Sequence, residues 1–259
     1  LSGKTVLVTG STSGIGLGLA KGFAASGANV ILNGLGETSE IEQMRLELDS
    51  NSTGMVSFDG ADMTQPDEIE SMIRRINTRH GVLDILVNNA GIQAVYPIDE
   101  FPLDRWDQII DINMNSAFHT VRAALPAMKA NGWGRIINIA SAHGLVASPF
   151  KAAYVAAKHG VVGMTKTIAL EVAEAGITCN AICPGYVLTP LVESQIPDTA
   201  RARGLTEEQV KRDVLLAAQW TKKFVTVEQL AGVAQFLCSD AAENITGIAL
   251  PVDGGWTAA

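Results

Sequence analysis

The chain has 259 residues, 47% of them hydrophobic and 18% charged, which suits one well-cored globular domain of the larger α/β kind. Its formal net charge of −8 gives no electrostatic reason to expect binding to nucleic acid or to an anionic membrane. The sequence shows no signal-peptide pattern and no apolar run of membrane-spanning length, so we expect a soluble, cytoplasmic protein. Because the first residue is Leu1 and not methionine, removal of a leader stays an open alternative.

The chain contains three cysteines, an odd number that does not build a disulfide framework in a protein of this length. Cys179 and Cys183 are separated by three residues, but no second pair of Cys or His residues follows them to complete a zinc site. We therefore predict that these two thiols and Cys238 are buried in a protein of a reducing compartment, and we predict no metal site.

A short β-branched run from Lys4 to Gly10 predicts a buried strand, and the periodic segment Leu17 to Ser26 predicts the helix that follows it. Glycines stand between the two elements at Gly10, Gly14 and Gly16. Glycines at a strand-to-helix turn let the backbone approach a pyrophosphate, which the helix N-terminus then stabilises. The alternative is a glycine turn that only closes the corner, but the position at the start of a βαβ pattern favours nucleotide binding.

The second strand, predicted at Ala28 to Asn33, leads to the position that distinguishes the two nicotinamide cofactors. An acidic residue there would hold the adenosine ribose hydroxyls, whereas an arginine or lysine would accept a 2′-phosphate. Leu35 is neither, no basic residue occurs from Asn29 to Gln43, and Glu37 and Glu40 would repel a phosphate. NAD is therefore favoured over NADP, by the absence of a cation.

A polar helix around Ser39 to Leu48 leads to a third strand near Met55 to Phe58, and the next helix is predicted at Pro66 to His80. Asp62 and Met63 follow the third strand, where they could hold an adenine edge. Asp62 is equally well placed to cap the turn before the helix, and the sequence does not separate the two roles.

A continuous apolar strand from Leu83 to Gly91 ends in two asparagines, Asn88 and Asn89. Amides at a buried strand end must satisfy several donors and acceptors, and they can do so by bracing the first glycine loop. Two helices are expected next, Leu103 to Asp111 and a longer one from Asn113 toward Lys129. The side chain of Asn113 lies in an apolar stretch and needs a partner: it could cap or kink the helix, or order a water beside a catalytic lysine.

The segment that carries chemistry begins where the predicted strand Gly134 to Ser141 ends, at the sheet edge where ligands bind. Tyr154 and Lys158 are four residues apart, so they share one face of a helix. A nearby ammonium favours the phenolate and lowers the pKa of a tyrosine. Together with the Ser141 hydroxyl, the pair could move a proton while hydride is exchanged at a carbinol carbon, although the same spacing also occurs on ordinary solvated helices.

The helix of Tyr154 is predicted to begin with Ser148 as N-cap and Pro149 at its first position. This start places Lys151 in the first turn, where the helix dipole disfavours a cation by ~0.3–1 kcal/mol. Because Lys151 also shares the face of Tyr154, we interpret it as a receptor for an anionic substrate. The alternative is an ordinary exposed lysine.

The last third of the chain is predicted to contain a strand at Gly176 to Gly185, an inserted helical lid at about residues 190–220, a helix at Thr226 to Ser239 and a strand at Ile248 to Val252. Thr206 to Gln209 predicts a capping box within the insert, and an excursion beyond the strand ends is where a lid would close. The alternation of strands and helices predicts an α/β fold with one doubly wound parallel sheet and helices on both faces.

In this order the motifs resemble the short-chain dehydrogenase/reductase family: TGSTSGIG at Thr9 to Gly16, NNAG at Asn88 to Gly91, CPG at Cys183 to Gly185, DGG at Asp253 to Gly255, and Ser141 with Tyr154 and Lys158. The resemblance covers residues 1–259 as a single domain. It implies a Rossmann-type sheet of about seven strands, a nicotinamide cofactor and a homotetramer. It also implies a catalytic tetrad of Asn113, Ser141, Tyr154 and Lys158.

The residues expected to contact NAD lie on the loops at the carboxyl edge of the sheet and on the helix of the catalytic tyrosine. They are Gly10, Thr12, Ser13, Gly14, Ile15, Gly16, Leu35, Asp62, Met63, Asn89, Tyr154, Lys158, Pro184, Gly185, Val187 and Thr189.

Longer segments, including NNAGIQ, RIINIASAHGLVAS and VDGGWTA, resemble the members of the family that interconvert (R)-3-hydroxybutyrate and acetoacetate with NAD. The resemblance implies a small 3-hydroxy acid as substrate, bound by these residues: Gln93, Ser141, His143, Lys151, Tyr154, Gln195 and Trp256. His143 is two residues after Ser141, so in an extended chain both side chains would point to the same side. A turn histidine, a loop amide and interface packing are the ordinary alternatives for His143, Gln93 and Trp256.

The sequence departs from this group at Tyr186 and Leu188, where we expect tryptophan and arginine, and at the lid end, Ala218 to Lys223. Both departures could alter lid closure or the room left for the substrate tail. Two other functions remain as alternatives. A 3-oxoacyl thioester reductase of the same family would use NADPH, and the basic residue near Leu35 that would support it is absent. A catalytically silent NAD-binding regulator would be indicated by loss of Tyr154 or Lys158, and both are present. We therefore predict an enzyme whose Tyr154 phenolate acts as general base.

Overall fold

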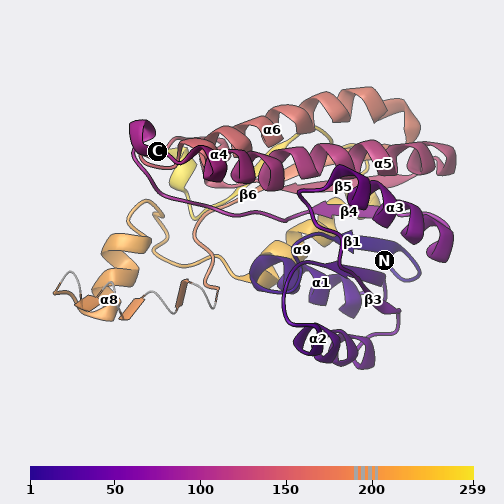
Figure 1. The fold of residues 1–259 in the computed structure, drawn as a ribbon, viewed down its shortest axis with the longest axis horizontal. Coiled ribbons are helices and arrows are strands. Elements are labelled where there is room, and N and C mark those ends of the chain that lie inside the picture. The colour runs from indigo at the N-terminus through magenta and orange to yellow at the C-terminus, as the bar shows by residue number, and fades with distance from the viewer. Residues whose placement is uncertain (190–191, 194–195, 198–199, 202–203) are drawn as a thin grey trace.

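The structure is a computed structural model, and it describes residues 1–189, 192–193, 196–197, 200–201 and 204–259. The described residues form a seven-stranded sheet in which every pair of neighbours is parallel (Figure 1). The strands lie in the order β3-β2-β1-β4-β5-β6-β7. Their bounds are β1 (Thr5–Val8), β2 (Asn29–Asn33), β3 (Val56–Asp59), β4 (Ile85–Asn88), β5 (Gly134–Ile139), β6 (Ile177–Pro184) and β7 (Ala249–Val252). The chain order reverses between β1 and β4, which is where such sheets bind dinucleotides, and the predicted fold class is confirmed.

Helices cover both faces of this sheet, because each strand-to-strand connection crosses over one of them. The helices are α1 (Gly14–Ala25), α2 (Thr38–Ser50), α3 (Pro66–His80), α4 (Leu103–Ile110), α5 (Ser116–Asn131), α6 (Ala152–Val172), α8 (Glu207–Gln209) and α9 (Val227–Leu237). Helices α1, α2 and α9 lie on one face, and α3, α5 and α6 lie on the other (Figure 1).

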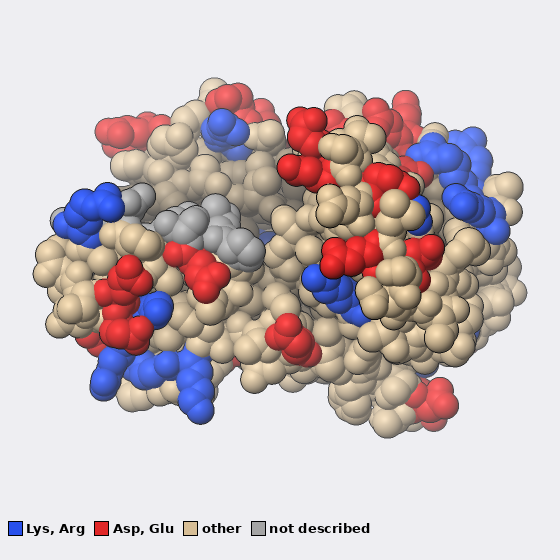
Figure 2. All heavy atoms as spheres, turned by 90° about the horizontal axis from the view of Figure 1, so that it is seen from below, with Lys and Arg blue, Asp and Glu red and all other residues tan. Residues whose placement is uncertain are grey.

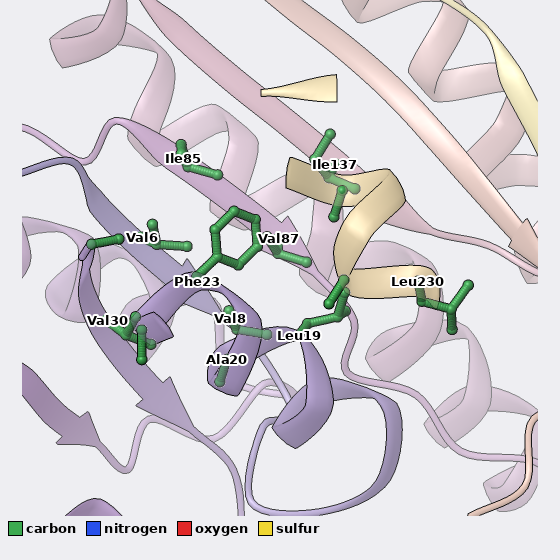
Figure 3. Close-up of a cluster of buried hydrophobic side chains, with 14 of the residues drawn as sticks. Val6, Val8, Leu19, Ala20, Phe23, Val30, Ile85, Val87, Ile137 and Leu230 are labelled. Atoms are coloured by element: carbon green, nitrogen blue, oxygen red, sulfur yellow. The ribbon is translucent and has the colours of Figure 1, made fainter. Parts of the chain in front are cut away.

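The strands are buried on both faces, and successive residues of one strand therefore enter two different cores. Val6 and Val8 of β1 pack with Phe23 of α1, which is fully buried at the centre of the cluster in Figure 3. Leu7, between them, packs on the opposite face with residues of α3 and α5 such as Ile73. A layer of helices thus packs on each face of the sheet. The edge at which the strands end remains for the candidate active site.

Two predicted helix boundaries differ from the structure. The helix of the catalytic tyrosine was expected to start at Ser148 and Pro149, but α6 begins at Ala152 with Lys151 as its N-cap residue. The reason is Phe150, whose φ of 65° is left-handed and interrupts the helical path. Lys151 is therefore not in the first helical turn; it is the N-cap residue that immediately precedes α6.

The predicted pair of helices around Asn113 is one nearly continuous rod with a deformation in it. A π-helical turn, Asp111–Asn115, joins α4 directly to α5 and contains Asn113. Such turns are uncommon and are frequent at functional sites. Asn113 therefore lies within a local distortion of the helix, and the three roles considered for its side chain, to cap the helix, to kink it or to order a water, stay predictions.

The insert before α9 is helical where the structure describes it. Thr206 caps α8 by accepting from the Gln209 backbone N–H, and the Gln209 side chain accepts from the Thr206 N–H, so the predicted capping box is confirmed. A π-helical turn, Val210–Leu215, follows. Figure 1 shows α8 standing away from the sheet, and closure of this insert over a ligand stays a prediction.

Charged side chains of both signs are interspersed among uncharged residues on the face shown in Figure 2. Over its described residues this face therefore does not present the continuous basic surface on which nucleic-acid binding relies. Within the described part of the chain, no helix has the length and apolar character needed to cross a membrane.

Candidate active site

The carboxyl edge of the sheet brings Ser141, Tyr154 and Lys158 together. Ser141 follows the end of β5, and α6 carries the other two. The Ser141 hydroxyl forms a hydrogen bond with the Tyr154 phenol, and the Lys158 Nζ lies 5.6 Å from the centroid of the tyrosine ring. A hydroxyl, a phenol and an ammonium thus meet on one side of the sheet edge.

Lys158 is desolvated, and one backbone group compensates it. Its side chain is only 4% exposed, and Nζ donates to the Ile139 carbonyl at 2.8 Å. Burial lowers the pKa of Lys158 from 10.5 to about 8. Because a pKa of about 8 lies near neutral pH, a small change in the surroundings of Lys158 can change the charge of its ammonium group.

Burial raises the pKa of Tyr154, and the hydrogen bond from Ser141 opposes this only in part. The sequence predicted that Lys158 would lower this pKa, and that prediction is wrong for the protein alone. The lysine ammonium is engaged with Ile139 and does not offset the desolvation of the phenol. A phenolate at neutral pH would need further positive charge beside the ring.

Asn113 links the π-helical turn to the end of β4. Its Oδ1 accepts from the Ile92 N–H at 2.8 Å, and its Nδ2 donates to the Ile92 carbonyl at 2.8 Å. A side chain on Gly91 would have no room, because its Cβ would lie 2.8 Å from Asn113 Oδ1. Asn113 therefore positions the segment after β4, and its support of a water beside Lys158 stays a prediction.

The glycine loop after β1 fits the pyrophosphate of a dinucleotide. Gly10 and Gly14 have φ of 61° and 54°, which residues with side chains rarely adopt. Ser13 occupies the N-cap position of α1 without a side-chain cap, and the first turn carries no acidic residue. The N–H groups of this turn are thus available to an anion. Gly16 packs against Gly10, where a Cβ would collide with the carbonyl oxygen, and Ile15 packs against the core.

Asn89 braces this loop, as its sequence position suggested. Its Nδ2 donates to the carbonyls of Thr9 and Gly10 at 2.9 and 3.0 Å. In return, the backbone N–H groups of Asn89 and Ala90 donate to Thr9 Oγ1 at 3.0 Å. The prediction that the asparagines at the end of β4 brace the first glycine loop is confirmed for Asn89.

The residues expected near the adenosine lie at the ends of β2 and β3. Leu35 is 78% exposed, and its carbonyl accepts from Thr12 Oγ1 at 2.9 Å. Asp62 accepts from the N–H and Oγ1 of Thr64 at 2.8 and 2.9 Å, so it closes the turn before α3, whereas the N-cap residue of that helix is Gln65. The Met63 side chain packs into the core under α3, and only its backbone remains for an adenine edge.

The chain after β6 runs back toward the glycine loop. The Gly185 N–H donates to the Val252 carbonyl at 3.0 Å, directly after Pro184 ends the strand. Val187 is buried and forms a bridge with Val225. Thr189 lies next to Gly14, because its methyl carbon would be 3.7 Å from a Cβ placed there. The predicted cofactor residues after β6 thus reach the pyrophosphate loop.

Four aromatic rings form a row that ends at the catalytic phenol. Tyr186 stacks on Trp256 with ring centroids 5.7 Å apart, and Trp256 meets His143 edge-on at 5.0 Å. His143 in turn meets Tyr154 edge-on at 6.1 Å. The structure therefore brings His143, one of the predicted substrate residues, beside the tyrosine, and a second, Trp256, beside His143.

His143 reaches this place by a different route from the one predicted. The chain after Ser141 is not extended: His143 lies in a 3₁₀ turn, Ala142–Gly144, and its N–H donates to Ser141 Oγ at 3.1 Å. Burial, with a smaller effect of the Lys151 charge, lowers the pKa of His143 to about 4. The imidazole is therefore neutral at neutral pH and can donate one hydrogen bond.

Lys151 is half-buried at the mouth of α6, and burial lowers its pKa. Gln93 is exposed on the segment after β4, beyond Ile92. Gln195 lies outside the described residues.

Sequence reasoning missed two contributors to this region. Tyr186 was noted only as a departure from a pattern, yet its ring stacks on Trp256 at the outer end of the aromatic row. Gln219 was noted only as part of the lid end that departs from the pattern, yet it is fully buried between the loops that carry Tyr186 and Trp256. A polar residue at the end of an insert was the available signal, and two of the segments that it contacts, at Gly185 to Tyr186 and at Gly254, are distant along the chain.

The three thiols are free and buried, as predicted. Burial raises the pKa of Cys179 to about 12 and that of Cys183 to about 11, so both are inert thiols at neutral pH. Among the described residues, no three His, Cys, Asp or Glu side chains cluster where they could hold a metal ion.

The family model for short chain dehydrogenases matches residues 4–200, and with this sheet order and site the chain belongs to the short-chain dehydrogenase family. The resemblance stated from the motifs is confirmed. Two relatives are called D-beta-hydroxybutyrate dehydrogenase. The protein of Rhizobium meliloti is 60% identical over 255 residues, which are 98% of this chain and 99% of its own. The protein of Cupriavidus necator is 55% identical over 259 residues, which are 100% of this chain and 99% of its own.

The fold comparison agrees with the family. A variant of actinorhodin polyketide ketoreductase, solved with NADPH, superimposes with a TM-score of 0.90 at 33% identity and covers 98% of this chain and 97% of its own.

The low pKa of His143 predicts a pH dependence of stability. Between the ordinary value of 6.5 and the folded value of about 4, the unfolded chain binds a proton here that the folded chain does not. The free energy of unfolding should therefore fall as the pH decreases through this window. In urea titrations, His143→Gln should show a shallower loss of this free energy than the unmodified protein. Equal slopes for the unmodified protein and His143→Gln would refute the assignment.

Proposed function

We propose that this protein is an NAD-dependent dehydrogenase that interconverts (R)-3-hydroxybutyrate and acetoacetate. The observation that carries the proposal is the contact of the His143 ring with the ring of Tyr154 on one side and with Trp256 on the other. A neutral imidazole beside the proton-transfer group suits a small substrate with a carboxylate near its reacting carbon. The two relatives called D-beta-hydroxybutyrate dehydrogenase support the same substrate over the full chain.

In the oxidative direction, Ser141 would hold the substrate hydroxyl and Tyr154 would remove its proton. The hydrogen bond from Ser141 to the phenol lowers the pKa of Tyr154 and so favours the base. When bound, the oxidised nicotinamide accepts the hydride and adds the positive charge that burial of the phenol requires. Proton transfer by a positioned group of this kind contributes ~10²–10⁴ in rate. Lys158, anchored on the Ile139 carbonyl, would hold the ribose hydroxyls beside the tyrosine.

The carboxylate of the substrate would be bound by Lys151 and His143. Lys151 is half-buried, and a charge-assisted bond there is stronger than one in open solvent. His143 stays neutral and would donate from its imidazole. Gln93 and Gln195 are proposed to complete the set, and Trp256 would pack on the hydrocarbon part.

We propose NAD and not NADP as the cofactor. Leu35 offers no charge to a 2′-phosphate, and the nearby Arg45 is engaged with Glu42 at 2.7 Å and with the Val56 carbonyl. The related ketoreductase was solved with NADPH, so the choice has to be measured on this protein.

We also propose the homotetramer and the cytoplasmic location that the sequence suggested. Large apolar side chains that are exposed on α4, α5 and α6 support an assembly, namely Leu103, Phe118 and Leu170. Burial of such residues between subunits would remove apolar area from water.

The direct experiment measures reduction of NAD and of NADP with (R)- and (S)-3-hydroxybutyrate. We expect turnover with the (R) acid and NAD alone. Turnover with neither acid, together with reduction of a neutral ketone or a 3-oxoacyl thioester, would leave the family assignment intact and refute the proposed substrate. Equal rates with NADP would refute the reasoning from Leu35.

Tyr154→Phe removes the phenol oxygen and keeps the ring. We expect turnover to fall by about 10²–10⁴ or more, because the proton acceptor is lost while the other groups remain. NAD binding, followed by quenching of protein fluorescence, should be retained. Full activity in this variant would rule out Tyr154 as the general base.

Lys151→Ala removes the cation at the mouth of α6. We expect the KM for (R)-3-hydroxybutyrate to rise by about 10- to 100-fold, the effect of losing a hydrogen bond to a charged group, with a smaller change in kcat. Lys166→Ala, an exposed lysine on the same helix, is the control and should behave like the unmodified enzyme. Unchanged kinetics in Lys151→Ala would exclude it from the carboxylate site.

A further inference from the structure

Gln219 is a fully buried amide at the point where the helical insert returns to the body of the protein. Its Oε1 accepts from the Tyr186 N–H, and its Nε2 donates to the Lys223 carbonyl at 2.7 Å. The side chain uses a donor and an acceptor at once, in a place that solvent does not reach.

Two glycines make the space that this side chain fills. A Cβ on Gly185 would collide with Gln219 Oε1, and a Cβ on Gly254 would lie 3.3 Å from Nε2. Gly185 immediately precedes Tyr186, and Gly254 lies two residues before Trp256. The amide of Gln219 is therefore packed between the backbones of the two loops that carry the stacked aromatic pair.

The residues that follow Gln219 form hydrogen bonds to the insert and to the C-terminal turn. Lys222 Nζ donates to the carbonyls of Leu216 and Ala217 at 3.0 and 2.7 Å, at the end of the π-helical turn. The Thr221 N–H donates to the Gly254 carbonyl at 3.1 Å. Insert, β6 loop and C-terminal turn thus meet at one short segment, residues 219–223.

We propose that Gln219 is a positioning residue that sets the Tyr186–Trp256 stack and, through it, the room for the hydrocarbon end of the substrate. The row of aromatic rings connects this stack to the tyrosine. Tyr186 stacks on Trp256, and the ring centroids of Trp256 and His143 are 5.0 Å apart. The ring centroids of His143 and Tyr154 are 6.1 Å apart. A shift of the loop that carries Tyr186 or Trp256 would therefore move the aromatic side chains that border the space for the substrate. This inference rests on the proposed function, because it concerns which 3-hydroxy acid fits.

An amide is the side chain that this place requires. Glutamate would present a second acceptor to the Lys223 carbonyl, and methionine, of similar length, would leave both the Tyr186 N–H and that carbonyl without their partner. A buried polar group without a hydrogen-bond partner is unfavourable, so either change would displace one of the loops.

The test compares the unmodified enzyme with Gln219→Met on (R)-3-hydroxybutyrate and (R)-3-hydroxypentanoate. We expect kcat/KM for the shorter acid to fall by about three- to tenfold, because losing both hydrogen bonds of Gln219 displaces the aromatic pair but removes no group that binds the substrate. We expect a smaller fall for the longer acid and an unchanged KM for NAD. Gln235→Met is the matched control, since Gln235 also bonds a backbone carbonyl, that of Gly22 at 2.7 Å, but at the contact of α1 and α9. A merely structural role would lower stability and both activities without changing their ratio, and that result overturns the proposal.

The indole N–H signal of Trp256 in an NMR spectrum, identified with Trp256→Phe, reads the position of the ring without turnover. We expect it to move in Gln219→Met and to stay in place in Gln235→Met. If the unmodified enzyme oxidises neither acid, the proposed function fails, and this signal still decides the positioning role. An unmoved Trp256 signal in Gln219→Met overturns that role.

Discussion

The site depends on buried asparagine amides that tie the ends of neighbouring strands together. Asn33 donates to the carbonyls of Asp59 and Ala61 at 3.0 and 2.9 Å, which connects the end of β2 to the end of β3. Asn88 donates to Asn138 Oδ1 at 2.9 Å, which connects β4 to β5. Because unsatisfied amides in these places would be costly, the strand ends have one arrangement in which every donor has its acceptor. The edge that receives the cofactor is rigid for this reason.

That rigidity lets the protein hold two groups in unfavourable surroundings. Lys158 is desolvated with one carbonyl for a partner, and Tyr154 is buried so that its pKa rises and not falls. In a less rigid site, the side chains of Lys158 and Tyr154 would turn toward water. Strongly shifted pKa values of this kind are concentrated at functional sites, which agrees with the position of both groups at the edge of the sheet.

The substrate side is built in another way. The region proposed for the cofactor consists of strand ends and one helix N-terminus, whereas the region proposed for the substrate is made of loops joined by aromatic contacts and by Gln219. Loops can change without disturbing the sheet, so the family can keep one hydride-transfer site and vary the molecule that it accepts. Tyr186, in place of an expected tryptophan, is a change of this kind.

The sequence by itself determined the alternation of strands and helices, the glycine loop and the spacing of Tyr154 and Lys158, because these depend on local periodicity and on residues close along the chain. The helix Pro66–His80 was predicted with both of its ends correct, since its proline start and its apolar stripe are local signals. Those features were sufficient to predict the fold class and the family.

Only the tertiary structure decided the features that need partners from distant segments. The left-handed Phe150, whose carbonyl accepts from the Tyr96 N–H at 2.9 Å, moved the start of α6 by several residues. The 3₁₀ turn at His143, the direction of the Tyr154 pKa and the burial of Gln219 likewise follow from what surrounds them. Periodicity reports which side of an element faces the core, but desolvation and hydrogen-bond partners depend on which segments the fold brings together, and this is why those features could not be predicted from the sequence.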